Sequence, residues 1–536
     1  MRDDVELSAN VFVPASGGRV PAILLRTPYG KGASLPDSLR VFVQHGYAVV
    51  VQDVRGRYAS EGVFDPLHQE VADGEDTLSW IASQEWSNQR VGMVGGSYLG
   101  ITQWKAALSG SPYLKAIFPV VAGGDEYLDR FYSPGGALKL GHRLEWLAEN
   151  LRASGFRPAF ERFVRSVPLR TADLAATGRA VDFFQRALDH PAYDAYWKSM
   201  STREQIGRIH VPVFAAGGWY DNFVQSDLEA FRLLRGRRRA VRLIVGPWPH
   251  NFSYSFPGVD FGPGSRLGLR QMQLEWFDYW LKRDGAAHLP NTPPGPPLRI
   301  FIMGANRWRD EQAWPPERAR PVMFYLSGRG RAKSTRGDGR LVTKPPRHNA
   351  FDAFIYDPHD PVPTAGGAVC CNPKLLPWGP MDQRAIERRK DVLIYTSAPL
   401  KRPLEVTGPV RAVLYVSTSA RDTDFTAKLV DVYPDGRALN ITDGILRLRY
   451  RESLERSVPA VPGAVYALSI DAGVTSIEFA KGHRIRLEVS SSNFPRFDRN
   501  PNTGRPVADE RELLRASQAV YHSRQRPSHL LLSVVP

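Results

Sequence analysis

The sequence predicts a chain of three structural parts: an α/β domain on a parallel sheet, a helical insertion within it, and an all-β domain after it. In residues 1–123 and 204–317, short apolar runs alternate with helical stretches, as in parallel strands joined by helices. Between these halves, residues 124–203 lack β-branched runs. From residue 318 to 536, short alternating segments separated by turns indicate an antiparallel sandwich or jelly roll.

The first half of the α/β domain alternates between strand and helix. Two intervening stretches are expected to be helices, at 73–83 and 97–108. Runs that are apolar along their whole length are typical of strands buried on both faces of a parallel sheet. Four such runs are expected to be strands: 20–26, 47–53, 91–94 and 115–121.

The second half continues the pattern, with strands expected at 211–216 and 242–245 and helices at 226–234 and 266–282. The last helix carries aromatic residues at helical spacing. This stripe could bind a ligand, but a surface packed against the core is favoured. The insertion at 124–203 is helical and aromatic-rich, and in an α/β sheet it would cover the carboxyl ends of the strands, where ligands bind. We therefore interpret it as a cap.

The charge distribution argues against a nucleic-acid partner. The net charge is +15, but the excess arginines are scattered along the chain. The one dense run, at 235–242, follows a predicted helix and is interpreted as a solvated helix end. Zinc-finger spacing and aromatic RNA-binding patterns are both missing. We expect no nucleic-acid binding.

No apolar run is long enough to span a membrane. The polar, acidic N-terminus does not resemble a signal peptide. A cytoplasmic protein without a membrane partner is therefore expected. Whether it forms a homo-oligomer is left open.

The two cysteines, Cys370 and Cys371, are adjacent. They cannot form the disulfide framework of a small secreted scaffold or a four-ligand zinc site. A vicinal disulfide is possible, but two small buried hydrophobic residues in a turn are the favoured interpretation. No metal and no organic cofactor is expected.

The segment VGMVGGSYLG, at 91–100, places Ser97 between a predicted strand and a predicted helix. It resembles the G-x-S-x-G elbow, a strained turn that exposes a nucleophilic serine at the top of an α/β-hydrolase sheet. Gly95 fits the pattern, but the last glycine, Gly100, lies one position too late. A glycine-rich turn with an incidental serine is the alternative.

Two further residues stand at strand ends in the expected chain order of serine, acid and histidine. Asp221 follows the strand before GGWYDNF, and His250 follows the strand before GPWPHNF. His250 would take the proton of Ser97, and Asp221 would fix the histidine tautomer and stabilise the imidazolium. The amide of Tyr98 is a natural oxyanion donor. Spacing alone indicates that Tyr29, in the RTPYGK loop, is a turn residue.

The chain resembles the cocaine-esterase-like acyl hydrolases, whose serine-peptidase family includes X-prolyl dipeptidyl aminopeptidases and α-amino-acid ester hydrolases. The segments that carry the resemblance are MRDDVELSANVFVP, RTPYGKG, QDVRGRYASEG, GGSYLG, GGWYDNF, GPWPHNF, YDPHDPVPTAGG, GPMDQR and DVLIYTSAPL. The resemblance implies an α/β-hydrolase core at 1–123 and 204–317, a helical cap at 124–203, and a C-terminal jelly roll at 318–536. It also implies that the Tyr29 hydroxyl joins the Tyr98 amide in the oxyanion hole. The tyrosine after the serine accounts for the longer elbow.

The substrate class is narrowed by two positions. The amino-acid ester hydrolases have two acidic residues closely after the triad aspartate, whereas this chain has Phe223 and Val224. A buried substrate ammonium without carboxylates is costly, so an amino-acyl substrate is disfavoured. Hydrolysis of a small-molecule ester is therefore the favoured activity. An amide, either a β-lactam side chain or an X-prolyl peptide, is the runner-up. A peptidase would need an anchor for the peptide N-terminus, and three acids could provide it: Asp125, Glu126 and Asp129.

Other residues near the predicted triad have less specific roles. Arg55, in QDVRGRY, is expected to brace loops near the site. Four aromatic residues flank the acid and the base and would line a substrate pocket, with packing against the sheet as the alternative: Trp219, Tyr220, Phe223 and Trp248. A catalytically silent binding protein with the same fold is the alternative of another class.

Overall fold

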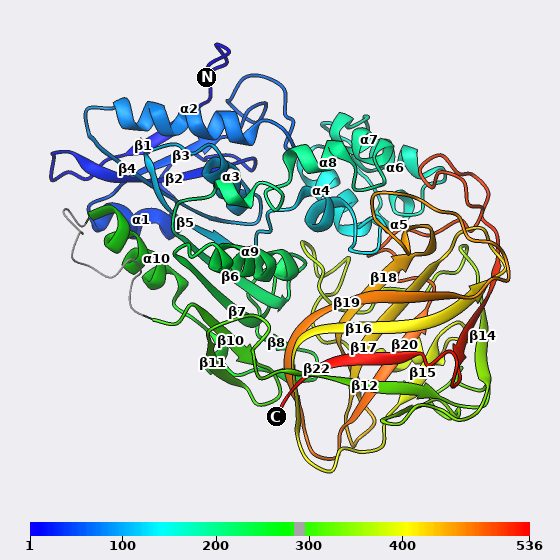
Figure 1. Ribbon diagram of the computed structural model, residues 1–536. Helices are drawn as coiled ribbons and strands as arrows, with labels where there is room; N and C mark the ends of the chain where they lie inside the picture. The colour runs from blue at the N-terminus through cyan, green and yellow to red at the C-terminus, as the bar shows by residue number, and fades with distance from the viewer. Residues whose placement is uncertain (283–294) are drawn as a thin grey trace.

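The computed structural model describes residues 1–282 and 295–536 (Figure 1). Its first sheet has nine strands in the order β1-β3-β2-β4-β5-β6-β7-β10-β11. The strands from β3 to β10 in this order run parallel, and β1 and β11 are antiparallel at the edges. Their bounds are β1 Ala9–Phe12, β2 Val20–Thr27, β3 Ala48–Asp53, β4 Ser87–Gly96, β5 Leu114–Val120, β6 Val213–Tyr220, β7 Val241–Pro249, β10 Leu298–Ile302 and β11 Arg307–Glu311.

Helices cover both faces of this sheet, as in an α/β-hydrolase. Helices α2 (Glu70–Ser83), α3 (Tyr98–Leu108) and α9 (Val224–Gly236) share one hydrophobic cluster with one face. The other face packs against α1 (Asp37–Gln44) and α10 (Leu269–Phe277), where Trp276 and Phe277 are buried. The aromatic stripe is therefore a core surface, as predicted. The helix itself changes at Asp278–Lys282, where the π-helix η5 replaces regular α-helical bonding.

The segment between β5 and β6 is helical and has its own hydrophobic cluster. Figure 1 shows these helices gathered beside the first sheet and above the C-terminal strands. Their bounds are η1 Glu126–Phe131, a π-helix, then α4 Gly141–Asn150, α5 Phe160–Phe163, η2 Leu169–Thr171, α6 Ala172–Thr177, α7 Asp182–Asp189, α8 Ala195–Met200 and η3 Ile206–Arg208. We call Glu126–Met200 the cap helices.

The C-terminal part is an all-β domain with an 11-stranded sheet. Its core is continuous with that of the first sheet, because one hydrophobic cluster contains Met303, just after β10, and Ile477 on β19. A small hairpin, β8 (Ser255–Phe256) with β9 (Val259–Asp260), precedes it. The strands are β12 Arg320–Ser327, β13 Arg340–Val342, β14 Ala350–Tyr356, β15 Leu393–Thr396, β16 Leu404–Thr418, β17 Asp424–Val432, β18 Ala438–Arg447, β19 Tyr466–Phe479, β20 Arg484–Ser490, β21 Ala516–His522 and β22 His529–Val535.

The cysteines correct one expectation. Cys370 and Cys371 form a vicinal disulfide in the loop between β14 and β15, so the favoured interpretation of two reduced, packed side chains is wrong. Cys371 has a φ of +118°, in the left-handed region that non-glycine residues rarely adopt. This unusual backbone lets adjacent side chains turn toward each other, and spacing alone does not reveal it.

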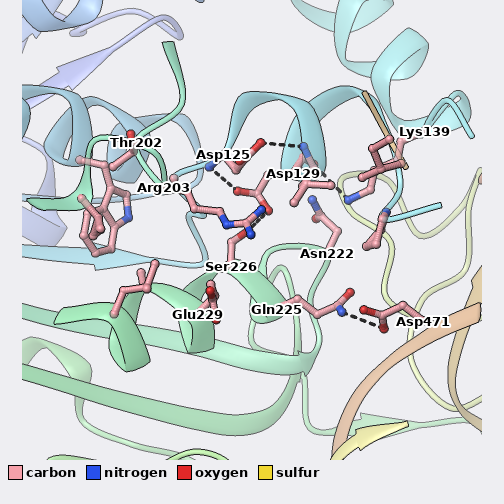
Figure 2. Close-up of a pocket in the computed structure, with 18 residues that line it drawn as sticks. Asp125, Asp129, Lys139, Thr202, Arg203, Asn222, Gln225, Ser226, Glu229 and Asp471 are labelled. Carbon is pink, nitrogen blue, oxygen red and sulfur yellow. Dashed lines mark hydrogen bonds between the residues drawn. The ribbon is translucent and has the colours of Figure 1, made fainter. Parts of the chain in front are cut away.

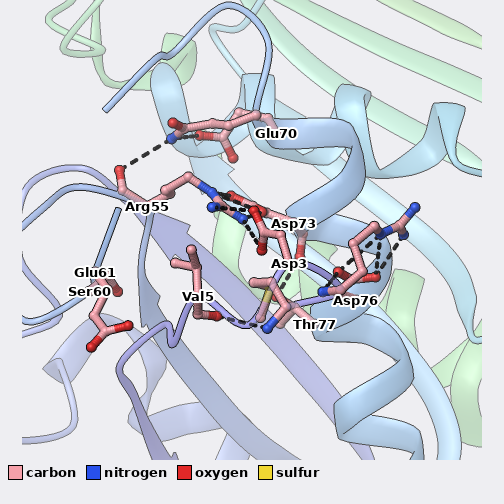
Figure 3. Close-up of polar contacts among 12 residues, drawn as sticks. Asp3, Val5, Arg55, Ser60, Glu61, Glu70, Asp73, Asp76 and Thr77 are labelled. Carbon is pink, nitrogen blue, oxygen red and sulfur yellow. Dashed lines mark hydrogen bonds and ion pairs between the residues drawn. The ribbon is translucent and has the colours of Figure 1, made fainter. Parts of the chain in front are cut away.

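Arg55 braces the N-terminal segment of the chain (Figure 3), whereas the sequence predicts that it braces loops near the site. Its guanidinium lies 2.6 Å from Asp73 on α2 and 2.7 Å from Asp3 in the N-terminal segment. Arg2 pairs with Asp76, also on α2, at 2.7 Å. The N-terminal segment is thereby fastened to α2. Within the part of the chain that the structure describes, no helix has the length and apolarity to cross a membrane.

Helix α3 packs unusually close to the loop after β5. A Cβ atom added at Gly100 would lie 2.3 Å from the Cβ of Ala122, far inside van der Waals contact. The late glycine of the elbow is thus required by the packing of the helix and not by the turn before it.

We expect Gly100→Ala to lower the free energy of unfolding by about 1–3 kcal/mol, because an extra methyl group in a packed core displaces its neighbours. The change is measured by urea denaturation. The matched control is Gly236→Ala at the end of α9, where an added Cβ would meet no atom within 4 Å. Equal denaturation midpoints for the two variants would contradict this account.

Candidate active site

Ser97 stands on a strained turn between β4 and α3. Its φ and ψ are 56° and −126°, a conformation rare for any residue with a side chain. The turn is held by its backbone: the Ser97 amide donates to Val120 at 2.9 Å, and the Ser97 carbonyl accepts from Gly100 at 2.8 Å. The side chain does not cap the helix. This geometry is that of a nucleophile elbow.

Asp221 and His250 meet at the same edge of the sheet. Asp221 follows β6, is fully buried, and its Oδ1 lies 2.9 Å from Nδ1 of His250, which follows the last residue of β7. A carboxylate only accepts hydrogen bonds, so Nδ1 carries the proton and Nε2 is left as the basic nitrogen. Since Ser97 follows β4, all three residues stand at the carboxyl ends of parallel strands.

Tyr29 lies in the loop after β2, and its oxygen accepts a hydrogen bond from Nε1 of Trp146 at 3.1 Å. Tyr29 as a whole is 38% exposed. Burial still raises the pKa of its hydroxyl, and hydrogen bonds with Trp146 and Ser97 partly oppose that rise. The hydroxyl therefore stays protonated at neutral pH and can donate a hydrogen bond beside Ser97.

Tyr98 contributes its backbone and not its hydroxyl. Its ring is buried and stacks on Trp146 with an interplanar angle of 6°. Its hydroxyl points away, donating to Oε1 of Glu70 at 2.7 Å. Tyr98 is the first residue of α3, so its amide has no acceptor within the helix. That amide is available for a ligand oxygen.

A chain of buried charges lies beneath these groups. The other oxygen of Glu70 pairs with Arg26 on β2 at 2.6 Å, with both side chains almost fully buried. Arg130 of the cap lies over the Tyr98 ring at 5.4 Å and pairs with Glu126. Buried charges are tolerated only when paired in this way.

The four aromatic residues expected to line a pocket fall into two groups, three that pack in the core and one that lies beside His250. Trp219 donates to the carbonyl of Phe301, Tyr220 packs near Phe256, and Trp248 packs against Trp308, all three buried. These contacts are those of packing residues, the alternative interpretation of this group. Phe223 differs, because its ring lies 5.8 Å from the ring of His250.

Sequence reasoning missed Trp146. This residue, from α4 of the cap, contacts Tyr29 through its N–H and Tyr98 through its ring face. Nothing in its local sequence marks it, because the motifs of the site are all at strand ends whereas Trp146 reaches the site from above.

A separate cavity of about 300 Å³ lies between the cap segment and the start of α9 (Figure 2). Asp125 and Asp129 line it, together with Asn222 and Ser226 of the α9 region. Ser97 and His250 are not among its lining residues in the described structure. The two acids are occupied: Asp125 accepts from Ser201 at 2.9 Å, and Asp129 accepts from Ser226 at 2.5 Å.

In residues 1–282 and 295–536, no three histidine, cysteine or acidic side chains gather as a metal site. Other histidines pair with single carboxylates in the β domain. His483 lies 2.9 Å from Asp431, and His522 lies 2.8 Å from Asp352. A histidine–aspartate pair is therefore not distinctive by itself, and the neighbouring elbow separates the His250 pair from these.

Two family models match the chain. Residues 3–251 match the X-Pro dipeptidyl-peptidase (S15 family) model. Residues 293–531 match the model of the X-Pro dipeptidyl-peptidase C-terminal non-catalytic domain. Together they cover both the first sheet with its cap and the all-β domain.

Relatives and solved structures agree with these models. Cocaine esterase from Rhodococcus sp. (strain MB1 Bresler) is 41% identical over 566 residues, covering 100% of this chain and 97% of that protein. A putative serine esterase from Mycobacterium bovis is 28% identical, covering 100% and 94%. The structure of an α-amino acid ester hydrolase has a TM-score of 0.85 and 28% identity, covering 100% of this chain and 95% of the other. An aminopeptidase from a Thaumarchaeota archaeon reaches 0.86 at 27% identity, with the same coverage.

We expect Glu70→Gln to lower the free energy of unfolding by about 3 kcal/mol, because it leaves the buried charge of Arg26 without its close partner. Urea denaturation measures the change. The control is Asp310→Asn, which breaks the surface pair with Arg299 at 2.7 Å and should cost less than about 1 kcal/mol. Similar losses in the two variants would mean that the buried pair is not the stronger constraint.

Proposed function

The chain belongs to the X-Pro dipeptidyl-peptidase (S15) family of serine hydrolases, and we propose that it hydrolyses small-molecule esters through an acyl-enzyme on Ser97. The observation that carries this proposal is the 2.9 Å pair of His250 and Asp221 at the sheet edge where the strained Ser97 turn also lies. Ester hydrolysis by a serine enzyme agrees with the relatives named cocaine esterase and serine esterase.

In the first step, the Ser97 oxygen attacks the ester carbonyl carbon while Nε2 of His250 takes the serine proton. Asp221 holds the proton on Nδ1 and stabilises the imidazolium that forms. The oxyanion of the tetrahedral intermediate accepts hydrogen bonds from the Tyr29 hydroxyl and the Tyr98 amide. As the intermediate collapses, His250 gives its proton to the leaving alcohol, and an acyl-serine remains.

The second step repeats the first with water. His250 takes a proton from water as the water oxygen attacks the acyl carbon, and the same two donors hold the oxyanion. Collapse returns the proton to Ser97 and releases the carboxylic acid.

Trp146 prepares Tyr29 for this role. A phenol hydroxyl has one proton to donate. Because the Trp146 N–H occupies a lone pair of the Tyr29 oxygen, the hydroxyl proton is left for the oxyanion. We infer that Trp146 is a positioning residue that acts through Tyr29.

Ester cleavage is favoured over X-prolyl peptide cleavage by the state of the acids in the cap. A peptide N-terminus needs a carboxylate, but Glu126 already pairs with Lys105 at 3.0 Å and Arg130 at 2.8 Å. Asp125 and Asp129 are bonded to hydroxyl groups, as described above. Two residues after Asp221, Phe223 presents an apolar ring to His250. Amide hydrolysis of other substrates is the second candidate.

We propose the same division of the chain as the sequence indicates: a catalytic domain at 1–123 and 204–317, a cap at 124–203 and a jelly roll at 318–536. A catalytically silent binding protein is the alternative that labelling of Ser97 can exclude. Homo-oligomerisation, a cytoplasmic location and the lack of nucleic-acid binding stay predictions.

We expect a fluorophosphonate probe to label the protein at Ser97, because the probe reacts only with an activated serine. Ser97→Ala and His250→Ala should each abolish labelling and turnover of p-nitrophenyl acetate. The control His483→Ala breaks a remote histidine–aspartate pair and should label normally. Native protein that shows neither labelling nor ester turnover would refute the proposed function.

We expect Tyr29→Phe to lower kcat by about 10²–10³, because it removes one of two oxyanion donors. The fold should stay intact, as circular dichroism can check. Tyr58→Phe, a change at a neighbouring exposed tyrosine, is the control and should leave kcat unchanged. An unchanged kcat in Tyr29→Phe would remove Tyr29 from the site.

A further inference from the structure

We propose that His142, on cap helix α4, is a substrate-binding residue and that it selects esters carrying a carboxylate group. This inference rests on the proposed function, because it assigns a substrate class to the same site. It is carried by three observations: an unsatisfied buried imidazole, its place on the helix face that reaches Tyr29, and the cations around it.

The first observation is the state of the ring. His142 is only 3% exposed, and neither ring nitrogen has a hydrogen-bond partner among the described residues. A buried donor and a buried acceptor without hydrogen-bond partners reduce the free energy of unfolding. Such groups in native proteins therefore usually have a functional explanation. A bound substrate that offers an oxygen to the ring would supply one.

The second observation is the direction of the ring. Residues four apart lie on the same face of a helix, so His142 and Trp146 share one face of α4. Trp146 on that face contacts the Tyr29 hydroxyl at 3.1 Å. The shared face places His142 one helical turn from Trp146, on the side of α4 that faces the proposed catalytic groups.

The start of α4 is held firmly. The amide of Gly141 donates to the carbonyl of Pro495 at 2.7 Å, and the amide of Leu140 donates to that of Arg496 at 3.0 Å. A Cβ at Gly141 would lie 2.7 Å from the Pro495 oxygen, so the approach is close. His142 is thus fixed next to a loop of the all-β domain.

The third observation is the charge around the ring. Burial, followed by the charges of Arg143, Lys139, Arg496 and His250, lowers the pKa of His142 well below its ordinary value. The ring is therefore neutral at physiological pH. A neutral imidazole has one N–H to donate and one nitrogen that accepts.

Two of the neighbouring cations are bonded to backbone oxygens instead of carboxylates. Arg143 donates to the carbonyl of Arg130 at 2.8 Å, and Lys139 donates to the carbonyl of Asp129 at 3.3 Å. The carboxyl of Asp129 itself has its pKa raised to about 7, by burial and by the charge of Asp125. The other two neighbours pair closely with acids, Arg496 with Asp443 and His250 with Asp221.

The surroundings of His142 therefore carry more positive than negative charge. In a poorly solvated site such a field attracts an anion strongly. A substrate carboxylate could accept the N–H of His142 and lie within the field of Lys139 and Arg143. An ester with an ammonium group would be repelled from the same place.

The test compares esters that differ in one end group. Mono-p-nitrophenyl adipate carries a carboxylate, and p-nitrophenyl hexanoate is its neutral match. A second pair, p-carboxyphenyl acetate and p-tolyl acetate, places the carboxylate on the alcohol side. The readout is the ratio of kcat/KM within each pair, because a general loss of activity cancels in the ratio.

We expect wild-type protein to prefer the carboxylate ester in at least one pair. His142→Leu replaces the imidazole with an apolar side chain of similar size and should reduce that preference about tenfold. His142→Gln restores a donor and an acceptor and should retain most of it. His142→Leu should also be at least as resistant to urea as wild type, because it removes the unsatisfied polar ring from the interior. His359→Ala, at an exposed histidine, is the control and should change nothing.

Two outcomes would overturn the proposal. One is an unchanged ratio in both pairs for His142→Leu. The other is a His142→Leu protein that is less stable and loses activity equally on charged and neutral esters, which would mark His142 as structural.

A binding measurement distinguishes failure of the proposed function from failure of the role proposed for His142. If wild-type protein neither hydrolyses esters nor reacts with a fluorophosphonate, the function fails, but adipate binding can still be measured by calorimetry. Adipate should then bind Ser97→Ala about tenfold more tightly than the double variant with His142→Leu. Equal binding, or no binding, would refute the role of His142 by itself.

Discussion

The site depends on one buried carboxylate. Glu70 receives Arg26 on one oxygen and the Tyr98 hydroxyl on the other. Arg26 lies near the end of the strand that leads to Tyr29, and Tyr98 is the neighbour of Ser97. The carboxylate therefore couples the two segments that carry the proposed oxyanion donors. Because a buried charge is tolerated only when its partners stay in place, this pairing restricts how far the two segments can move apart.

Much of the fold could be predicted from residue patterns. The apolar runs and helical stretches of the first sheet correspond to β2 to β7 and their helices, and Asp221 and His250 stand where parallel strands end. Such features follow from local sequence and from the general geometry of α/β sheets. The elbow is harder to predict from the sequence, because the position of Gly100 is set by its contact with Ala122 and not by the turn.

What could not be predicted depends on contacts between distant segments. Trp146 comes from a cap whose helices have ordinary sequences, and only the docking of that cap brings it into contact with Tyr29 and Tyr98. The aromatic residues beside the triad show the reverse. Trp219 and Trp248 are next to strand ends in the sequence, yet both are buried in packing. Proximity in sequence indicates the element that a residue belongs to, but the direction of its side chain depends on the neighbours of that element.

The attachment of α4 to the loop around Pro495 has a consequence for how the protein matures on the ribosome. Ser97, Asp221 and His250 are synthesised well before Pro495 and Arg496, whose carbonyls accept from the start of α4. Domains generally fold from the N-terminus during synthesis. The nascent chain can therefore assemble its first sheet while the roof of the site still lacks its support. The position of α4, and of the Trp146 that contacts Tyr29, is therefore fixed only after the loop around Pro495 has been made.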